Sequence, residues 1–189
     1  MQTQSLTGGF NDAPTASATA FRVVLDVMAR PGKISEITGA TPPAPLSIAA
    51  GTLLLTLCDP ETPLWMASSF CSTDIKDWLR FHTGAPIVES RSEAMFALGS
   101  WAELSPITEF AIGTPEYPDR SATLIVEMDA LTDSGTILRG PGIKDTAELS
   151  LPEVAAFQGN AGLFPLGLDF FFTSGNRIAA LPRTTKLGG

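Results

Sequence analysis

The sequence predicts one globular domain that combines helices and strands around a single core. A chain of 189 residues can bury one sizeable core. Its 44% hydrophobic and 17% charged residues are typical of a globular protein, with an apolar excess that predicts an oligomer interface. Segments with a helical apolar period are interspersed with short apolar runs typical of strands. We therefore expect a flexible N-terminal arm over residues 1–13 and a single domain over residues 14–189.

The first predicted helix follows residues 12–15, where Asp12 and Thr15 offer capping side chains on either side of a proline. Pro31 and Gly32 end it. The apolar residues recur at i, i+3, i+4 and i+7. This spacing predicts one apolar stripe on the helix, made of Phe21, Val24, Leu25 and Met28.

Two more helices are predicted in the first half of the chain. The apolar period over residues 46–57 covers three turns and favours a helix, although residues 53–57 also fit a buried strand. A third helix is expected from Asp74 to about His82, with Gly84 as its C-terminal stop.

Short apolar runs bounded by turn residues predict the strands. They are expected over residues 33–37, 63–66, 87–88, 94–98, 122–128, 135–139, 169–173 and 178–181. The last two form a hairpin around the turn at residues 174–176. Residues 101–106 are expected to be a connector, and residues 151–163 a last helix.

Charge and cysteine content exclude several classes of function. A net charge of −8 and a pI of about 4.5 argue against nucleic-acid and membrane partners, which require a basic face. Cys58 and Cys71 lack the spacing of a metal site, so no metal is expected. No signal-like segment and no stretch of eighteen apolar residues is present, which predicts a cytoplasmic protein.

Arginine recurs beside Gly, Pro, Ser or Thr in four loop-like segments, namely residues 29–32, 119–123, 138–143 and 181–185. Guanidinium groups, hydroxyls and free backbone amides hold phosphate or phosphonate oxygens. The predicted anion-binding residues are Arg30, Arg120, Ser121, Thr123, Arg139, Gly140, Gly142, Arg183, Thr184 and Thr185. A polar subunit interface is the alternative. A third reading pairs each arginine with a carboxylate of its own fold, for example Arg120 with Glu116 or Asp119.

No pair of nucleophile and base is evident in the sequence. His82 is the single histidine, and its place at a helix end suits a structural role better than acid–base chemistry. It is nevertheless the one catalytic candidate. The carboxylate pair Asp59 and Glu61 flanks a proline, as does the pair Glu116 and Asp119, so loop ordering explains both better than a catalytic dyad.

Seven motifs in order resemble the PhnH family, which belongs to the bacterial carbon–phosphorus lyase system. They are FRVVLDVMARPG, LLLTLCDPETPLW, RFHTGAP, GTPEYPDRSATL, LRGPGI, LFPLGLDFFF and LPRTT, and they extend from Phe21 to Thr185. The resemblance implies a three-layer α/β domain with a mixed sheet, similar to the large domain of PLP-dependent transferases. It also implies a homodimer that assembles with the subunits PhnG, PhnI and PhnJ.

The resemblance further implies an accessory subunit of the core complex, which is needed to convert an alkylphosphonate and a nucleoside triphosphate to a ribose 1-alkylphosphonate 5-triphosphate. The alternative is a self-sufficient transferase or lyase with an arginine-lined site. No PLP is expected, because none of Lys33, Lys76, Lys144 and Lys186 lies in a segment that also supplies a phosphate loop and a carboxylate for the pyridinium.

Overall fold

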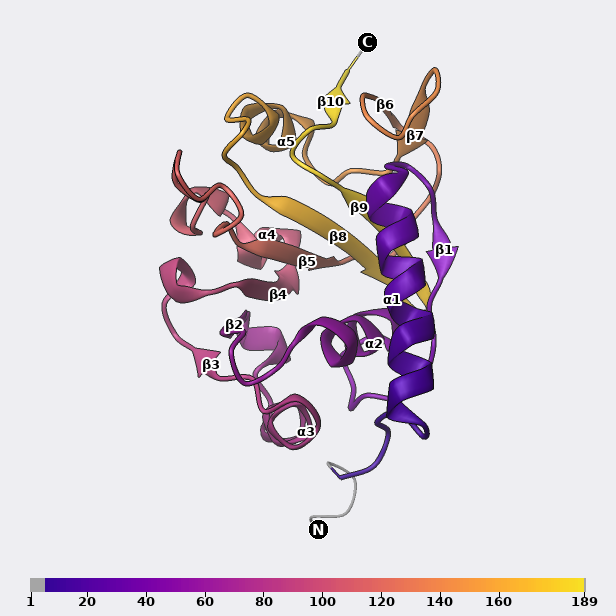
Figure 1. Cartoon of the computed structure of the whole chain (residues 1–189), viewed down its shortest axis with the longest axis vertical. Helices are drawn as coiled ribbons and strands as arrows, with labels where there is room; N and C mark the ends of the chain where they lie inside the picture. Colours follow the sequence, from indigo (N-terminus) through magenta and orange to yellow (C-terminus); the bar gives the residue numbers. More distant parts are fainter. Residues whose placement is uncertain (1–5, 189) are drawn as a thin grey trace.

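A computed structural model describes residues 6–188 of the chain, which form an α/β fold around a mixed sheet (Figure 1). The helices are α1 (Ala13–Ala29), α2 (Ile48–Leu57), α3 (Thr73–Thr83), α4 (Trp101–Leu104) and α5 (Val154–Ala161). The short 3-10 helices are η1 (Ser68–Phe70), η2 (Arg91–Glu93) and η3 (Ile107–Glu109).

The large sheet has seven strands in the order β1-β9-β8-β5-β4-β2-β3. They are β1 (Ser35–Glu36), β2 (Leu64–Met66), β3 (Ile87–Val88), β4 (Phe96–Ser100), β5 (Thr123–Glu127), β8 (Asp169–Ser174) and β9 (Arg177–Leu181). The five strands from β3 to β8 are parallel, whereas β9 and β1 are antiparallel to their neighbours. The hairpin predicted between β8 and β9 is confirmed.

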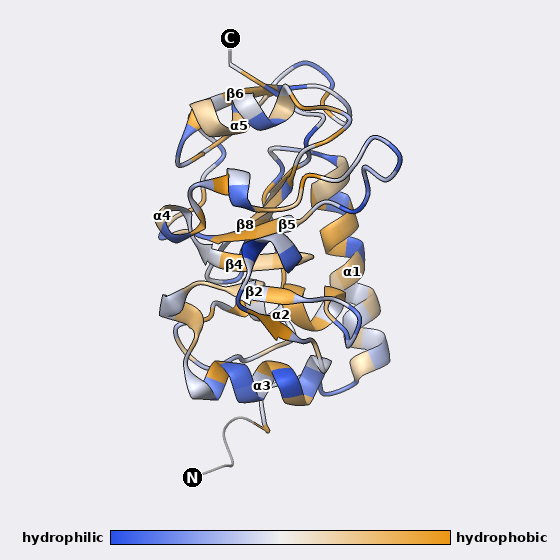
Figure 2. Cartoon of the chain, turned by 90° about the vertical axis from the view of Figure 1, so that its left-hand side faces the viewer, coloured by the Kyte–Doolittle hydropathy of each residue, from blue (hydrophilic) through white to orange (hydrophobic). Residues whose placement is uncertain are grey.

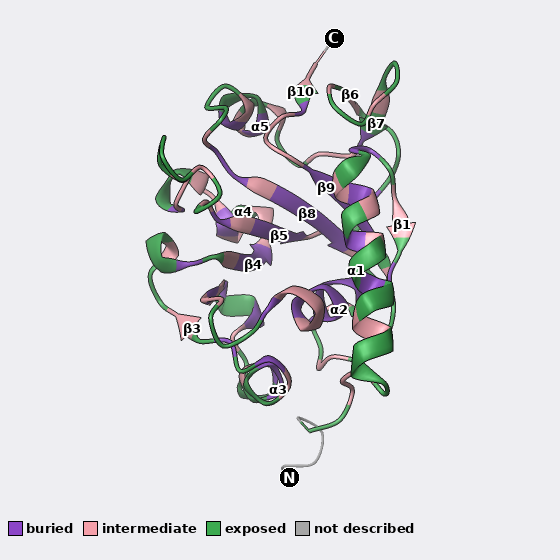
Figure 3. Cartoon of the chain, in the orientation of Figure 1, coloured by how far each residue is buried: buried purple, intermediate pink, exposed green. Residues whose placement is uncertain are grey.

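The two faces of this sheet cover separate hydrophobic cores, which makes the domain three-layered. Phe171 of β8 faces a core shared with α1, α2 and α3. Its neighbours Phe170 and Phe172 face the other core, which includes Leu104 of α4 and Phe157 of α5. The strands β4, β5 and β8 are buried along most of their length (Figure 3) and are largely hydrophobic (Figure 2). Because successive side chains point to opposite faces of the sheet, each of these strands contributes residues to both cores.

Residues 46–57 contain a helix, so the strand alternative is wrong. Ser47 caps α2, because its Oγ accepts a hydrogen bond of 3.0 Å from the Ala50 N–H. The helix is buried along most of its length, which explains why its apolar residues do not alternate with polar ones. Gly51 lies against Pro42, where an added Cβ would stand 2.6 Å from the proline ring.

The predicted apolar stripe on α1 is only partly buried. Phe21 is 43% exposed and Leu25 is 52% exposed, whereas the helix buries Ala20, Val24 and Val27. Apolar residues cover two faces of α1, so the helical period of 3.6 residues fits either face as the buried one. The pattern alone does not decide which face meets the sheet.

Further differences concern short elements. Residues 101–106 include the helix α4 rather than only a connector, and α5 is shorter than predicted. The predicted strand 135–139 is present as β6 (Thr136–Arg139), but it belongs to a separate sheet. That sheet also contains β7 (Ala147–Leu149) and β10 (Lys186–Leu187), which the sequence did not predict.

The predicted N-terminal arm lies partly outside the described residues, which begin at Leu6. The described part of the arm contacts the core that is shared with α1, α2 and α3. The Thr7 carbonyl accepts a hydrogen bond of 2.9 Å from the Trp78 indole, and the Gly8 carbonyl accepts one of 2.7 Å from the Thr41 N–H. Phe10 packs against the same core.

Candidate functional site

Arg183 has its hydrogen-bonding partners within the chain. It lies beside the starts of the parallel strands β5 and β8, a region that we call the strand-start edge and define by residues 118–121, 165–169 and 181–185. Its guanidinium Nη2 lies 2.6 Å from Asp169 Oδ2, and its Nη1 donates to the Pro118 carbonyl at 2.9 Å. The same group also hydrogen-bonds the Ser121 hydroxyl. Only 13% of the Arg183 side chain is exposed.

Two predicted residues, Arg183 and Ser121, are therefore brought together across 62 positions of the sequence. Asp169, which was not predicted, neutralises the arginine and also accepts a hydrogen bond of 2.8 Å from its backbone N–H. These bonds join the loop before β5, the start of β8 and the segment after β9. Arg183 therefore holds these three segments together, which is a structural role.

Arg120 lies on the surface of the same loop and has no carboxylate partner among the described residues. Its guanidinium carbon stands 4.0 Å from the centre of the Tyr117 ring, a cation–π contact. Neither Glu116 nor Asp119 forms the expected ion pair with it in the described part of the chain. Thr123 begins β5, where its N–H donates to the Met95 carbonyl at 2.9 Å.

The other predicted residues extend this edge toward the small sheet. Gly140 lies beside Thr184 and Thr185, with an ideal Cβ 3.2 Å from the Thr184 carbonyl oxygen. Gly142 has a φ of +82° and lies so close to the Ala29 carbonyl that an added Cβ would stand 1.9 Å from its oxygen. Only glycine fits there. The four arginine-containing loops are therefore neighbours in space, and each contacts the next.

The cations of this series do not converge on one point. Arg30 pairs with Asp26, which also lies 2.5 Å from Lys33. Arg139 is exposed and lies opposite Lys186 in the ladder between β6 and β10. The Thr185 side chain is buried, and its hydroxyl has no hydrogen-bond partner in the described part of the chain. Next to this pair in the ladder, Leu187 lies opposite Leu138, and both pack in the second core. Thr185 is two residues from Leu187 and therefore lies on the same face, which is opposite to the face of Arg139.

His82 is packed between aromatic rings rather than placed in a cavity. Its ring centre lies 5.2 Å from that of Trp78 and 4.9 Å from that of Phe81. An added Cβ on Gly9 would meet the imidazole at 2.4 Å, so the N-terminal segment covers it. The Nε2 atom is buried and has no hydrogen-bond partner among residues 6–188. This environment favours the structural role over acid–base chemistry.

A polar cavity lies at the opposite ends of the parallel strands, which we call the strand-end edge. It has a volume of about 450 Å³. Its lining residues are Pro45, Ser47, Ser69, Phe70, Ser100, Glu103, Glu127, Met128, Asp129, Ser174 and Gly175. Ligands of open α/β sheets usually bind outside this end of the strands. The cavity is lined by three carboxylates and contains no lysine, arginine or histidine.

Two of these carboxylates occupy helix N-termini. Glu127 Oε1 accepts a hydrogen bond of 2.9 Å from the Ser47 N–H at the start of α2. Glu103 forms a capping box with Ser100 at the start of α4 and accepts a bond of 3.2 Å from the Ser69 N–H. Helix N-termini are natural anion sites, so these two positions already hold an anionic group of the chain itself.

The environments of these two glutamates shift their pKa values in opposite directions. Burial raises the pKa of Glu127, and the hydrogen bonds from Ser47 and Thr173 offset this only in part. Burial also acts to raise the pKa of Glu103, but hydrogen bonds from Ser69 and Ser100 outweigh it and lower the value. The difference arises because Glu127 is much more deeply buried than Glu103, which also accepts more hydrogen bonds.

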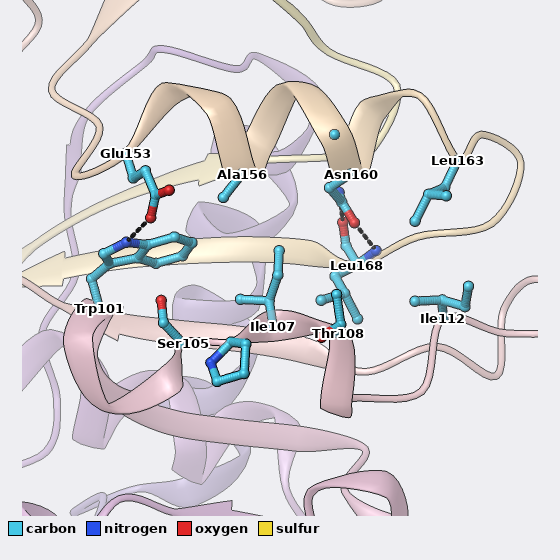
Figure 4. Close-up of a pocket in the computed structure, with 12 residues that line it drawn as sticks. Trp101, Ser105, Ile107, Thr108, Ile112, Glu153, Ala156, Asn160, Leu163 and Leu168 are labelled. Atoms are coloured by element: carbon cyan, nitrogen blue, oxygen red, sulfur yellow. Dashed lines mark hydrogen bonds between the residues drawn. The ribbon is translucent and has the colours of Figure 1, made fainter.

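A larger, apolar groove crosses the second face of the sheet between α5 and the α4–η3 segment (Figure 4). Its volume is about 840 Å³. It is lined by Trp101, Ser105, Pro106, Ile107, Thr108, Ile112, Glu153, Ala156, Gly159, Asn160, Leu163 and Leu168. No lysine or arginine is among these residues, so the groove does not suit a phosphate or phosphonate group.

The walls of the groove are held by specific contacts. The Trp101 indole N–H donates to Glu153 Oε2 at 3.0 Å, and its ring lies 4.6 Å from that of the buried Phe157. Asn160 is buried at the floor, where its amide exchanges two hydrogen bonds with the backbone of Leu168, at 2.8 Å and 2.7 Å. These bonds fix α5 against the start of β8, so the groove is preformed.

The sequence reasoning did not identify the strand-end cavity or the groove. One signal was available, because Ser100 and Glu103 have the S-x-x-E spacing of a capping box before α4. The groove has no comparable signal, since it depends on how two distant segments pack. Among residues 6–188, no group of three or more His, Cys, Asp or Glu side chains is arranged to hold a metal ion. None of the described helices has the length and apolarity needed to cross a membrane.

Comparison with known proteins places the chain in a family. The family described as "Bacterial phosphonate metabolism protein (PhnH)" matches residues 8–188. The "Alpha-D-ribose 1-methylphosphonate 5-triphosphate synthase subunit PhnH" of Rhizobium meliloti (strain 1021) is 41% identical over 194 residues, which cover 98% of this chain and 97% of that protein. The "Putative C-P lyase subunit protein HtxG" of Stutzerimonas stutzeri is 28% identical over 176 residues, with 89% and 84% coverage. These matches confirm the resemblance seen in the motifs, and the chain belongs to the bacterial phosphonate metabolism family PhnH.

Proposed function

We propose that this protein is an accessory, non-catalytic subunit of the complex that makes a ribose 1-alkylphosphonate 5-triphosphate during phosphonate catabolism. The observation that carries the proposal is the 41% identity to a synthase subunit over nearly the full length of both chains. The partner subunits expected from the family are PhnG, PhnI and PhnJ.

The environments of the predicted site residues support a non-catalytic role. Arg183, which would hold the anion in a self-sufficient enzyme, is clamped by Asp169, and His82 is covered by the N-terminal segment. Arg120 is exposed and stacked on Tyr117, so it remains available for a subunit contact. We therefore still predict that Arg120 contributes to an anion site at a subunit interface. An anion site formed by one chain alone is disfavoured.

We further propose that the protein works without PLP, although its mixed sheet between two helical layers supports the likeness to the large domain of PLP-dependent transferases. The residues present do not fit that cofactor. The strand-end cavity has no lysine to form a Schiff base, and Glu127 and Glu103 occupy the helix N-termini that would receive a phosphate.

A homodimer in the cytoplasm completes the proposal. The exposed apolar residues of α1 support self-association, because Phe21 and Leu25 lie one turn apart on the surface of this helix and could pack against the same helix of a second copy. The free thiols of Cys58 and Cys71 are typical of a reducing compartment. Sedimentation velocity of the purified chain would detect the dimer, and a monomer at micromolar concentration would contradict it.

Co-production tests the proposed function. The chain is produced with PhnG, PhnI and PhnJ of its own source, one of them tagged, and the complex is isolated by affinity and gel filtration. We expect this chain to elute with the others, and synthase activity to require it. A chain that remains separate would contradict the proposal. Titration of the isolated chain with methylphosphonate and ATP addresses the alternative, because a self-sufficient enzyme would bind both.

A further inference from the structure

We propose that the apolar groove between α5 and the α4–η3 segment is the docking site for an amphipathic helix of a partner subunit. The inference rests on the proposed function, since it assigns a surface to the assembly that the family relationship supports. It concerns residues that the sequence did not single out.

The groove has the composition of a protein-binding site rather than of a surface depression. Trp101 stands at one end and Leu163 at the other, with Ile107 and Ile112 along the lower wall (Figure 4). Leu163 is 45% exposed, and the neighbouring Phe164 is 60% exposed, so the apolar surface continues beyond the groove. Concave apolar surfaces with aromatic anchors are typical of binding hot spots.

The charges of the groove define the partner. Glu153 lies at its rim and forms no ion pair with any cation in the described part of the chain, and no lysine or arginine lines the groove. An anionic ligand such as a nucleotide or phosphonate would meet a carboxylate and no compensating charge. A segment with apolar side chains and a lysine or arginine near Glu153 would be complementary.

The walls favour a helix as the occupant. Residues 154–161 of α5 and the α4–η3 segment present side chains. The edge strands of the two sheets are β1 and β3 in the large sheet and β10 and β7 in the small one, and none of them lines the groove. A partner strand therefore finds no sheet edge to pair with in the groove, whereas a partner helix can dock there. The eight residues of α5 span about 12 Å at 1.5 Å per residue, which matches roughly two turns of a partner helix.

Gly159 gives the partner space to approach. It lies in the middle of α5 and lines the groove, and an added Cβ would meet no atom within 4 Å. Ala156, one turn earlier, is also small. A wall of small residues lets a second helix pack closely, as at other helix interfaces. The same open space makes Gly159 a site where a large side chain blocks the groove without disturbing the fold.

Gly159→Phe is therefore the test variant. The chain is produced with its partner subunits as in the co-purification above, and the fraction that elutes with them is measured. We expect unfolding stability to be unchanged or slightly higher, because a helical glycine is replaced. Association with the partner subunits should weaken by about a hundredfold. Ala130→Phe adds the same ring at an exposed loop and should leave association unchanged.

A second pair of variants tests the charge. Glu153→Lys should weaken association more than tenfold, whereas Glu116→Lys, which makes the same change of net charge on an exposed loop, should not. Circular dichroism and the unfolding midpoint of each isolated variant establish that the fold is intact.

The outcomes separate the two proposals. If the wild-type chain does not join the partner subunits, the proposed function is wrong, and this docking site with it. If the wild-type chain and Gly159→Phe join them equally well, the docking site alone is wrong. If Gly159→Phe instead abolishes self-association of the isolated chain but still joins the partner subunits, a second copy occupies the groove, and the assignment to a partner subunit is wrong.

Discussion

The two edges of the parallel strands carry opposite side-chain chemistry. The strand-start edge holds Arg183 and Arg120, while the strand-end edge holds Glu103, Glu127 and Asp129 around a polar cavity. Ligands of open α/β sheets usually bind at the strand-end edge. In this chain the cavity at that edge is lined by carboxylates, whereas Arg183 and Arg120 lie at the other edge. The comparison teaches that residue type alone does not identify an anion site, because its position in the sheet and its internal partners decide what it can bind.

The largest effect is expected at the strand-start edge, from Arg183→Met. This change leaves Asp169 without its cation and removes the bonds to Pro118 and Ser121. We expect the free energy of unfolding to fall by about 3 kcal/mol. Urea denaturation measures it.

Arg120→Met serves as the control for this change, because Arg120 is exposed and stacked on Tyr117 alone. Its effect should be within about 0.5 kcal/mol. If Arg183 instead served an external anion, the Met variant would keep its stability, and methylphosphonate would raise the unfolding midpoint of the wild-type chain only. That result would reverse the comparison between the two edges.

A smaller loss is expected at the strand-end edge, from Glu103→Ala. The variant loses the capping box of α4 and the bonds to Ser69, which should lower stability by about 1 kcal/mol at neutral pH. Because the pKa of Glu103 lies below its ordinary 4.5, its charged form contributes stability above that pH, and the contribution is lost as the pH falls through the lowered pKa. The difference between variant and wild type should therefore shrink in acid. The exposed Glu93→Ala is the control, and a pH-independent difference would contradict the assignment.

The smallest effect, of opposite sign, is expected from Glu127→Gln. The amide can keep the hydrogen bonds with Ser47 and Thr173 while it removes a buried charge. Because the pKa of Glu127 is raised above 4.5, its stabilising contribution is complete below that pH and is lost as the pH rises through the raised pKa. The variant should therefore be slightly more stable than wild type at neutral pH, and this advantage should disappear in acid. Thermal unfolding across this pH range measures it, and a neutral-pH loss would show that the charged form of Glu127 stabilises the fold.

Much of the fold follows from the sequence, since α2, α3 and the hairpin of β8 and β9 have strong periodicity or clear caps. Two-residue and three-residue strands such as β10 and β7 have no pattern of their own, and they form only because β6 is there to pair with them. The apolar pattern does not show which face of α1 is exposed, because two of its faces are apolar.

The candidate site was less accessible to sequence reasoning. The structure places the arginine loops next to one another, through the contacts of Arg183 with Ser121 and of Gly142 with Ala29, but their cations do not converge on one point. What could not be deduced was Asp169 as the partner of Arg183, because that contact depends on the packing of the segment after β9 against the start of β8. The groove around Gly159 depends likewise on the packing of segments about 50 residues apart.

The strand order has a consequence for how the chain folds during synthesis. β8 lies between β5 and β9, and among the described strands β1 pairs with β9 alone, although β8 and β9 come late in the sequence. Until residues 169–181 have left the ribosome, β1 has no partner and β5 has an open edge along its apolar length. The nascent chain is therefore exposed to misassembly for most of its synthesis, and a chain ending at residue 168 should be rapidly degraded in a limited proteolysis experiment.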